Sequence, residues 1–379
     1  MEKISSLRFT FIDALRGIAA FAVLFHHMLH NSVMEVTLRH ILPLPLQVFS
    51  DYGANGVQVF FVLSGFVIAH SLRNFDGKAA TITNFILRRQ LRLDPALWTV
   101  LAFTLCLDRL RLAIPSLHAE VMPTIGDVFR NLFYLQNILH AKQVVGVAWT
   151  LCIEVQFYIV FVALLSLGKL QIPRKRASSV NASTLSVTLV FCLGISAILY
   201  SFFLSSQGAY FIAYWHYFAA GVLCYYGIQQ RVPQWVFLSF MSVFLVATII
   251  HTTPPPIIGI VTALCIYAVG RTGHLTDWLN NKPLQYLGRI SYSLYLIHLV
   301  VAVSVLQFGY KITHQNQPMC IFWFVLAGIL SIAAAHLLYT FVEKPSLKWS
   351  ESFKRQSVAF GYSSQSKPAT LQPVGIEWP

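Results

Sequence analysis

The sequence has little charge, because Asp, Glu, Lys and Arg together make up only 11% of its 379 residues. Soluble globular proteins carry about 25% charged residues, so the composition excludes that class. With 29 Phe and 16 Tyr, it also excludes the polar, glycine-periodic or heptad chains typical of disorder, collagen and coiled coils. Hydrophobic residues make up 56% of the chain and the mean hydropathy is +0.63. This balance predicts an all-α, polytopic helical membrane protein.

Cysteine is also scarce. The six residues lie one to an apolar segment, without CxxC spacing and without a histidine at ligand spacing: Cys106, Cys152, Cys192, Cys224, Cys265 and Cys320. Isolated cysteines of this kind act as small apolar residues. We therefore expect them in the core, and we predict no metal site and no bound cofactor.

Apolar runs follow one another along nearly the whole chain. They cover residues 9–29, 53–72, 93–107, 147–167, 184–204, 209–228, 233–251, 256–270, 287–308 and 319–342. A spanning helix needs about 20 residues, so most runs are long enough, whereas those near 93 and 256 require tilt or a thinner bilayer. The sequence thus predicts about ten transmembrane helices. The first is not a cleaved signal peptide, because Asp13 and Arg16 lie in its first turns and no small-residue cleavage site follows.

The basic residues are unevenly distributed between the two sides of this topology. With the N-terminus inside, 20 of the 27 Lys and Arg lie on the inner side, six lie outside and Arg16 lies within the first span. Cytoplasmic loops are enriched in Lys and Arg, so this distribution predicts that both termini are cytoplasmic. The net charge of +13 is then mainly a signal of orientation, and nucleic acid is not an expected partner.

Two segments differ from the spans and their short loops. Residues 349–379 are rich in Ser, Gln and Pro, which predicts a disordered cytoplasmic tail after a membrane domain at 1–348. Residues 108–146 form a long outside connection. Within it, apolar residues recur at helical spacing and predict a helix at the outer interface: Ile125, Val128, Phe129, Leu132, Phe133 and Leu139.

Ionisable side chains at membrane depth are costly, so each is a functional candidate. Arg16 and His27 are eleven residues apart on the first span, which places them about 20° apart on one helix face and roughly 16 Å apart along the axis. Asp13 lies close to this face, whereas His26 points about 80° away. A snorkelling arginine with an interfacial histidine is one alternative, and metal binding by His26, His27 and His30 is another.

Other candidates lie on later spans. Glu154 is about two turns into the fourth span, at a predicted depth similar to that of His27, where a carboxylate would hold the ring tautomer. Arg88, Arg89 and Arg92 precede the third span on the inside, and they either receive a phosphate-rich ligand or form a solvated basic cluster.

The ninth span carries a third polar group. Ser291 and His298 are seven residues apart and share a helix face with Tyr295. A hydrogen bond between helices explains this face as well as catalysis does.

Six motifs then occur in a fixed order. They are Asp13-Ala14-Leu15-Arg16-Gly17-Ile18-Ala19-Ala20 followed by His27, Gly56-Val57-Gln58-Val59-Phe60-Phe61-Val62-Leu63-Ser64-Gly65-Phe66, Arg88-Arg89-Gln90-Leu91-Arg92 with Pro95, Trp149-Thr150-Leu151-Cys152-Ile153-Glu154-Val155-Gln156-Phe157-Tyr158, Gly288-Arg289-Ile290-Ser291-Tyr292-Ser293-Leu294-Tyr295-Leu296-Ile297-His298, and Glu343-Lys344-Pro345. Together they resemble integral membrane acyltransferase family three, from about residue 9 to 346. The chain departs from that pattern at Gln58, where an acidic residue is common, at Asp94, where an aromatic is common, at Thr150 and at Val155.

The resemblance implies a membrane O-acyltransferase of a bacterial inner (plasma) membrane. Such an enzyme moves an acyl group, most often acetyl, from cytoplasmic acyl-CoA to a hydroxyl of an extracytoplasmic glycan or glycolipid. The implied catalytic residues are His27, Arg16 and Glu154, and Arg89 and Arg92 are the implied acyl-CoA-binding residues. The implied supporting residues are Asp13, Ser64, Ser291, Tyr292 and His298.

A secondary transporter or proton-coupled exporter is the alternative function, with the same buried His, Glu and Arg side chains acting as a relay. Transporters of that kind usually have repeated halves or pairs of helices broken by Gly or Pro, and the sequence has neither. It leaves open the acceptor, the acyl group, and whether transfer is direct or passes through an acyl-histidine.

Overall fold

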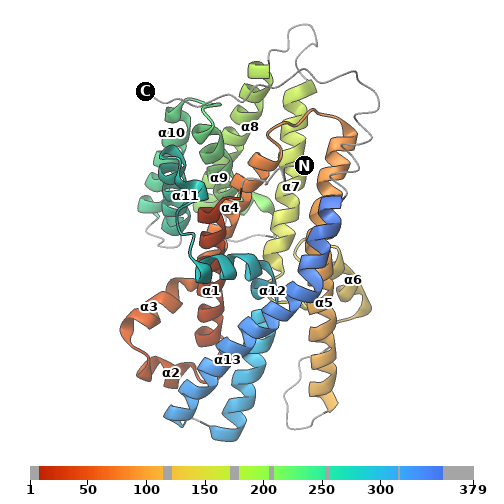
Figure 1. Ribbon diagram of the computed structural model, residues 1–379, viewed down its shortest axis with the longest axis vertical. Helices are drawn as coiled ribbons and strands as arrows, with labels where there is room; N and C mark the ends of the chain where they lie inside the picture. The colour runs from red at the N-terminus through yellow and green to blue at the C-terminus, as the bar shows by residue number, and fades with distance from the viewer. Residues whose placement is uncertain are drawn as a thin grey trace.

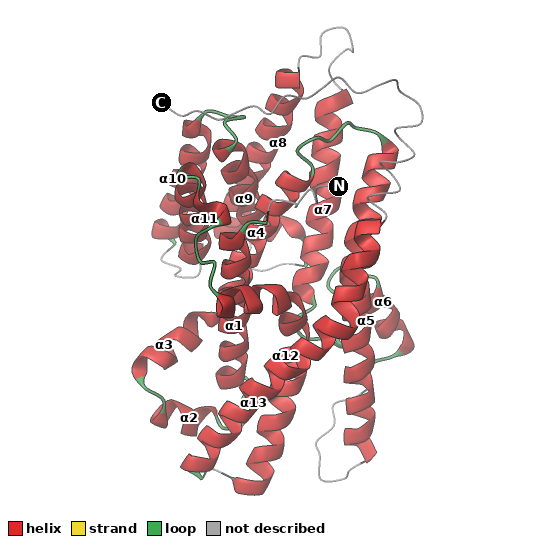
Figure 2. Ribbon diagram, in the orientation of Figure 1, coloured by secondary structure: helices red, strands yellow, loops and turns green. Residues whose placement is uncertain are grey.

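The computed structural model describes residues 8–113, 122–170, 179–204, 209–251, 256–314 and 316–352, and all regular structure in these ranges is helical (Figure 2). The α-helices are α1 (Thr10–His30), α2 (Glu35–Ile41), α3 (Leu44–Gly53), α4 (Gly56–Ser71), α5 (Ala79–Ala113), α6 (Ile125–Leu132), α7 (Trp149–Leu170), α8 (Ser179–Leu199), α9 (Trp215–Ile228), α10 (Gln234–Ile250), α11 (Pro256–Arg271), α12 (Lys282–Thr313) and α13 (Gln317–Leu338). Four short helices join or extend them: η1 (Tyr200–Leu204), η2 (Phe211–Ala213), η3 (His274–Thr276) and η4 (Tyr339–Glu343).

The all-helical prediction is confirmed over these residues, and each of the ten apolar runs lies on a helix. Five helical segments are long and apolar enough to cross a membrane, and α3 with α4, bent by 49° at their junction, would make a sixth. The apolar helices α10 and α11 are shorter. The count of about ten spans and the cytoplasmic termini stay predictions. The helix that begins with α13 continues to Ser352, and the rest of the expected tail lies outside the described residues.

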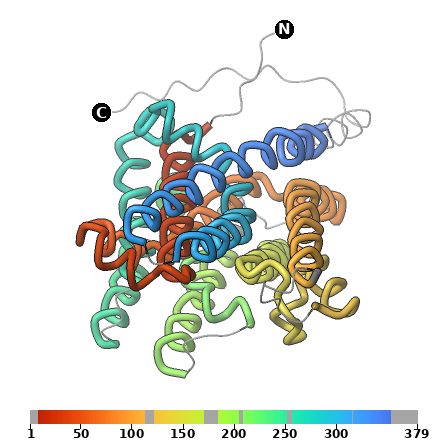
Figure 3. Tube along the Cα trace, turned by 90° about the horizontal axis from the view of Figure 1, so that it is seen from below, coloured from red at the N-terminus to blue at the C-terminus, as the bar shows by residue number. Residues whose placement is uncertain are grey.

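Helix α1 runs through the middle of the molecule (Figures 1 and 3). Its main partner is α12, which in turn packs against α13 to form the hairpin at the lower end of Figure 1. Helices α1, α12 and α13 thus form one group. In a second group, α8, α10 and α11 surround α9, in which every residue from Trp215 to Gly227 is buried. Helix α4 links the two groups because it contacts both α1 and α9.

Glycines set the close approach of the linking helices. A Cβ added to Gly65 of α4 would lie 2.1 Å from the Phe218 carbonyl oxygen of α9, and one added to Gly221 would lie 2.0 Å from that of Val62. At the α1–α12 crossing, a Cβ on Gly288 would lie 2.2 Å from the Asp13 carbonyl oxygen. Small residues allow such contacts between membrane helices, so these motif glycines have a packing role.

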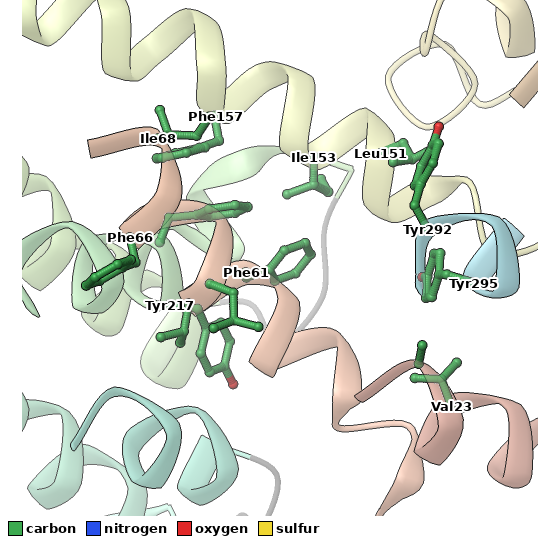
Figure 4. Packing of buried hydrophobic residues seen from close by; sticks show 14 of the residues in the cluster. Val23, Phe61, Phe66, Ile68, Leu151, Ile153, Phe157, Tyr217, Tyr292 and Tyr295 are labelled. Atoms are coloured by element: carbon green, nitrogen blue, oxygen red, sulfur yellow. The ribbon is translucent and has the colours of Figure 1, made fainter. Parts of the chain in front are cut away.

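The core beside α4 is strongly aromatic. Phe157 of α7 stacks on Phe218 of α9 with ring centroids 4.1 Å apart, and Phe61 of α4 lies 4.7 Å from Phe218. Figure 4 shows Phe61 and Phe157 within this cluster of buried side chains. The outer faces of α10 and α13 instead expose large apolar side chains, as expected of surfaces that face lipid. These side chains are Trp235, Val246, Ile249, Ile250, Phe322, Ile329 and Leu337.

The cysteines follow the prediction only in part. Those buried as expected are Cys152, Cys224 and Cys320, whereas the other three, Cys106, Cys192 and Cys265, are exposed. A lipid-facing helix surface accepts a small apolar side chain as readily as the core does, so apolarity of the surrounding segment does not predict burial here.

The long connection after α5 contains the predicted helix, α6. Trp98 Nε1 donates to the Leu132 carbonyl oxygen at 3.3 Å, and the Tyr134 hydroxyl donates to Asp94 Oδ1 at 2.6 Å. Ala113, the end of α5, lies 19 residues after Asp94, or about 28 Å along the helix. The part of the connection around α6 therefore lies beside the middle of α5, and its position at the outer interface stays a prediction.

Candidate active site

Five helices, α1, α4, α5, α7 and α12, converge on one cavity. It holds about 790 Å³ of space, including the part open to solvent. The polar side chains that line it are Arg16, Ser64, Arg89, Arg92, Thr150, Glu154, Tyr158, Tyr292 and Tyr295. The structure thus brings together six of the residues predicted from the sequence, which lie on five helices and are up to 276 positions apart, from Arg16 to Tyr292.

Arginine dominates the charge of the cavity. Arg16 of α1 lines it together with Arg89 and Arg92 of α5, whereas Glu154 is the one carboxylate among the lining residues. Arg89 lies 5.5 Å from the centre of the Tyr158 ring. Arg92 Nε is buried and has no hydrogen-bond partner in the described part of the chain. A cavity with three guanidinium groups and one carboxylate suits an anionic ligand, because guanidinium groups bind phosphate oxygens in a planar, bidentate way.

Glu154 is bound to two hydroxyl groups. Its Oε1 accepts a hydrogen bond from Ser64 Oγ of α4 at 2.7 Å and another from the Tyr158 hydroxyl, one turn further along α7. No hydrogen bond joins Glu154 to His27 among the described residues, so the expected role of Glu154 in orienting that ring is wrong. Two side chains at equal depth on different helices meet only if both point toward each other, and that direction depends on the rotation of each helix about its own axis.

The neighbour of His27 is His298 of α12. His27 Nδ1 lies 2.9 Å from the Val23 carbonyl oxygen and 3.2 Å from His298 Nε2. His298 is fully buried, and its Nδ1 lies 3.0 Å from the Leu294 carbonyl oxygen. Close packing of α1 against α12 brings the two rings together. The catalytic candidate therefore has an imidazole as its partner.

Tyr295 lies between the cavity and the histidine pair. It lines the cavity, and its ring centroid is 6.0 Å from that of His298. Its hydroxyl lies 2.9 Å from Thr150 Oγ1 at the start of α7. Figure 4 shows Tyr292 and Tyr295 close together on α12. The Tyr292 hydroxyl donates to the Leu93 carbonyl oxygen at 2.7 Å, which ties α12 to α5 at the wall of the cavity.

Two predicted residues have other contacts. Asp13 forms an ion pair with Arg8 at 2.6 Å, and its carbonyl group packs against Gly288. Ser291 is fully buried and donates to the Gly288 carbonyl oxygen of its own helix at 2.9 Å. Neither residue lines the cavity, so both support the crossing of α1 and α12.

Tyr158 ends one of the sequence motifs but receives no role from it, although its hydroxyl binds Glu154 in the cavity. The signal is present in the sequence, because Tyr158 follows Glu154 by four positions and such pairs share a helix face. Residue spacing within α7 thus identifies the partner of Glu154, whereas equal depth on two different helices does not.

Known proteins resemble this chain over most of its length. YrhL of Bacillus subtilis, whose name proposes a peptidoglycan O-acetyltransferase, is 25% identical over 377 residues, which cover 88% of this chain and 54% of that protein. The O-acetyltransferase OatA of Staphylococcus aureus is 22% identical over 433 residues, covering 99% of this chain and 62% of OatA. The chain therefore spans less than two thirds of the length of these relatives. No solved structure matches it.

A family model described as an acyltransferase domain matches residues 9–340. This range contains all five helices of the cavity and both histidines. The chain belongs to acyltransferase family three.

Proposed function

We propose that this protein is a membrane O-acetyltransferase that moves acetyl from cytoplasmic acetyl-CoA to a hydroxyl of an extracytoplasmic cell-envelope glycan. The observation that carries the proposal is the arginine-lined cavity, which reaches Tyr295 beside the pair of His27, which is partly buried, and His298, which is fully buried. A polyanion site next to an imidazole base suits a phosphorylated donor and a hydroxyl acceptor. The names of YrhL and OatA favour peptidoglycan as the acceptor.

The donor would enter from the basic side of the membrane. Its phosphates would bind Arg89 and Arg92 in the first half of α5, where Arg92 Nε has no hydrogen-bond partner among the described residues. The pantetheine arm would then follow the apolar wall of α4 past Arg16. Arg16 and His27 are separated by roughly 16 Å along α1, a distance that an extended arm would bridge. This route explains why the arginines and the histidine occupy different levels of the same group of helices.

The transfer needs one base and no redox step. His27 Nε2 would take the proton of the acceptor hydroxyl while the hydroxyl oxygen attacks the thioester carbonyl carbon. A carbon–oxygen bond forms, the carbon–sulfur bond breaks, and the leaving CoA thiolate takes the proton from Nε2. The products are the acetyl ester of the glycan and free CoA, and His27 returns to its initial state. This mechanism does not require an acyl-enzyme intermediate.

The orientation follows from the distribution of basic residues. Twenty of the 27 Lys and Arg lie on the proposed inner side, which supports an entrance at Arg89 that faces the cytoplasm, where acetyl-CoA is made. His27 then lies toward the outer side, where a glycan acceptor would arrive. We propose the plasma membrane of a bacterium as the location, in line with the organisms of the named relatives.

The direct test compares the cell-envelope glycans of strains with and without the gene by mass spectrometry. We expect ester-linked acetyl groups to disappear from one glycan in the deletion strain and to return with the wild-type gene, but not with His27→Ala. The spectrum would name the acyl group and the acceptor. Unchanged esters on every glycan, with the protein expressed in the parent strain, would contradict the proposal.

The donor site has its own test in the charge reversals Arg89→Glu and Arg92→Glu. Losing a charged hydrogen bond costs about 1.5–3 kcal/mol, so each variant should raise the KM for acetyl-CoA by about 10-fold or more. The matched control is Arg88→Glu, because Arg88 lies in the same basic cluster but does not line the cavity. Steady-state kinetics in membrane vesicles would measure the difference.

The outcome separates three cases. A rise in KM confined to Arg89 and Arg92 supports phosphate binding in the cavity. An equal rise for Arg88→Glu would mean that the surface charge of α5 acts at long range. A change in the KM of the acceptor alone would show that the donor binds elsewhere.

A further inference from the structure

We propose that His298 is a positioning residue that fixes the tautomer of His27 with an unprotonated Nε2 and then shares the charge of the protonated ring. The inference deepens the proposed function and rests on it, because His27 is the base in that reaction. The histidine pair joins α1 to α12, and its two members are 271 residues apart in the sequence.

The proton of the His298 ring lies on Nδ1. This nitrogen is 3.0 Å from the Leu294 carbonyl oxygen, which accepts hydrogen bonds and cannot donate. A neutral ring with a proton on Nδ1 has a lone pair on Nε2. That lone pair points to His27 Nδ1, 3.2 Å away. His298 is fully buried, where a neutral ring costs far less free energy than an imidazolium.

The same reasoning applies to His27. Its Nδ1 faces two acceptors, the Val23 carbonyl oxygen at 2.9 Å and His298 Nε2 at 3.2 Å, so it carries a proton that both share. The opposite assignment, with both protons on Nε2, would direct a lone pair at the Val23 carbonyl and another at the Leu294 carbonyl. Two repulsive contacts thus disfavour that arrangement, whereas the first has none.

This assignment leaves His27 Nε2 as the basic nitrogen, and it makes no hydrogen bond within the described part of the chain. When Nε2 takes a proton, the ring becomes positive and Nδ1–H becomes a stronger donor to His298 Nε2. A carboxylate fills this position in the serine hydrolase triad. Here no carboxylate of the described residues makes a hydrogen bond or ion pair with His27, and the two carboxylates that face α12 and the cavity are bound by serines, Glu343 by Ser293 and Glu154 by Ser64. An imidazole therefore supplies the acceptor.

The first test uses His298→Leu and His298→Gln in membrane vesicles, with acetyl-CoA as donor and soluble peptidoglycan fragments as acceptor. Leucine removes the acceptor atom at similar volume, whereas glutamine places an amide oxygen near the position of Nε2. Removing a group that orients a metal-bound imidazole costs about 10- to 100-fold in activity, and we expect a similar effect for a group that orients a catalytic imidazole. We expect this loss of kcat for leucine, with the KM for acetyl-CoA changed by less than about twofold, and substantial recovery for glutamine.

Equal losses in the two variants would show a packing role only, and wild-type kcat in the leucine variant would overturn the inference. Both outcomes leave the proposed function intact if the wild type is active and His27→Ala is not. The second test does not depend on turnover. Nitrogen NMR of the protein with isotope-labelled histidine should show the protons of both rings on Nδ1, assigned by comparison with His27→Ala and His298→Gln. A proton on Nε2 of either ring would contradict the assignment, even if the wild type transferred no acetyl to the fragments.

Discussion

Replacement of His27 by alanine should lower kcat for acetyl transfer by about 100- to 10,000-fold, the range that a general base contributes. The variant removes the imidazole whose Nδ1 contacts His298 and whose Nε2 makes no hydrogen bond within the described residues. Its fold should be kept, because His27 is only partly buried and its backbone remains helical. Release of CoA from acetyl-CoA, measured with peptidoglycan fragments as acceptor, would give the rate.

The control is His26→Ala. The His26 ring stacks on that of His30, with centroids 4.2 Å apart, and its Nδ1 lies 2.8 Å from the Ser50 carbonyl oxygen of α3. This side of α1 faces α3, away from His298, so we expect less than about a 10-fold change, caused by looser packing of α3. Similar activity in His27→Ala and the wild type would refute the role of His27. A loss as large in His26→Ala would move the base to the α3 side.

The contrast between the two histidines is one part of the site that the sequence predicts well. Counting 100° per residue along α1 separates His26 from the face shared by Arg16 and His27, and the structure places His26 against α3. The arginines of α5 are a second success, because Arg89 and Arg92 line the cavity with Arg16. Both predictions depend on positions within one helix or on a motif, where spacing alone determines the geometry.

Contacts between helices are harder to predict. The sequence places Glu154 and His27 at similar depth, but α4 lies against α7 and supplies Ser64 to the carboxylate, while α12 supplies His298 to the imidazole. Depth follows from counting residues, whereas the choice of neighbour depends on which helix faces can approach closely. At the α1–α12 crossing the close approach depends on glycines such as Gly288, whose effect is visible only when the opposing backbone is known.

The contacts of the connection after α5 are hard to predict for a similar reason. Hydrophobic spacing correctly predicts α6, but it does not contain the direction in which the chain returns. Asp94, a departure from the family pattern, accepts a hydrogen bond from the Tyr134 hydroxyl and holds the connection beside the middle of α5. An aspartate within an apolar run was thus a structural signal here, paired with a tyrosine forty positions later.

The close approach of α4 and α9 predicts that Gly221→Ala lowers the stability of the protein strongly. The added Cβ would lie 2.0 Å from the Val62 carbonyl oxygen, and a backbone atom within two packed helices cannot move away as a flexible side chain would. Overpacking costs typically 1–3 kcal/mol and sometimes more, against a gain of about 1 kcal/mol from the helix propensity of alanine. We expect a net loss at the upper end of this range, because the whole helix pair must separate. Thermal unfolding in detergent would show it as a lower Tm.

Gly126→Ala is the matched control for that variant, because Gly126 also lies in a helix, α6. Its added Cβ would have no atom closer than Thr124 Oγ1 at 3.7 Å, so the Tm should stay unchanged or rise slightly. Gly65→Ala tests the same helix pair from the other side, with the Phe218 carbonyl oxygen 2.1 Å from the new Cβ. Losses at Gly65 and Gly221, with none at Gly126, would establish that α4 and α9 touch through their backbones. A wild-type Tm for Gly221→Ala would mean that the two helices lie further apart, and Ser64, on the same helix as Gly65, would then no longer be held against Glu154.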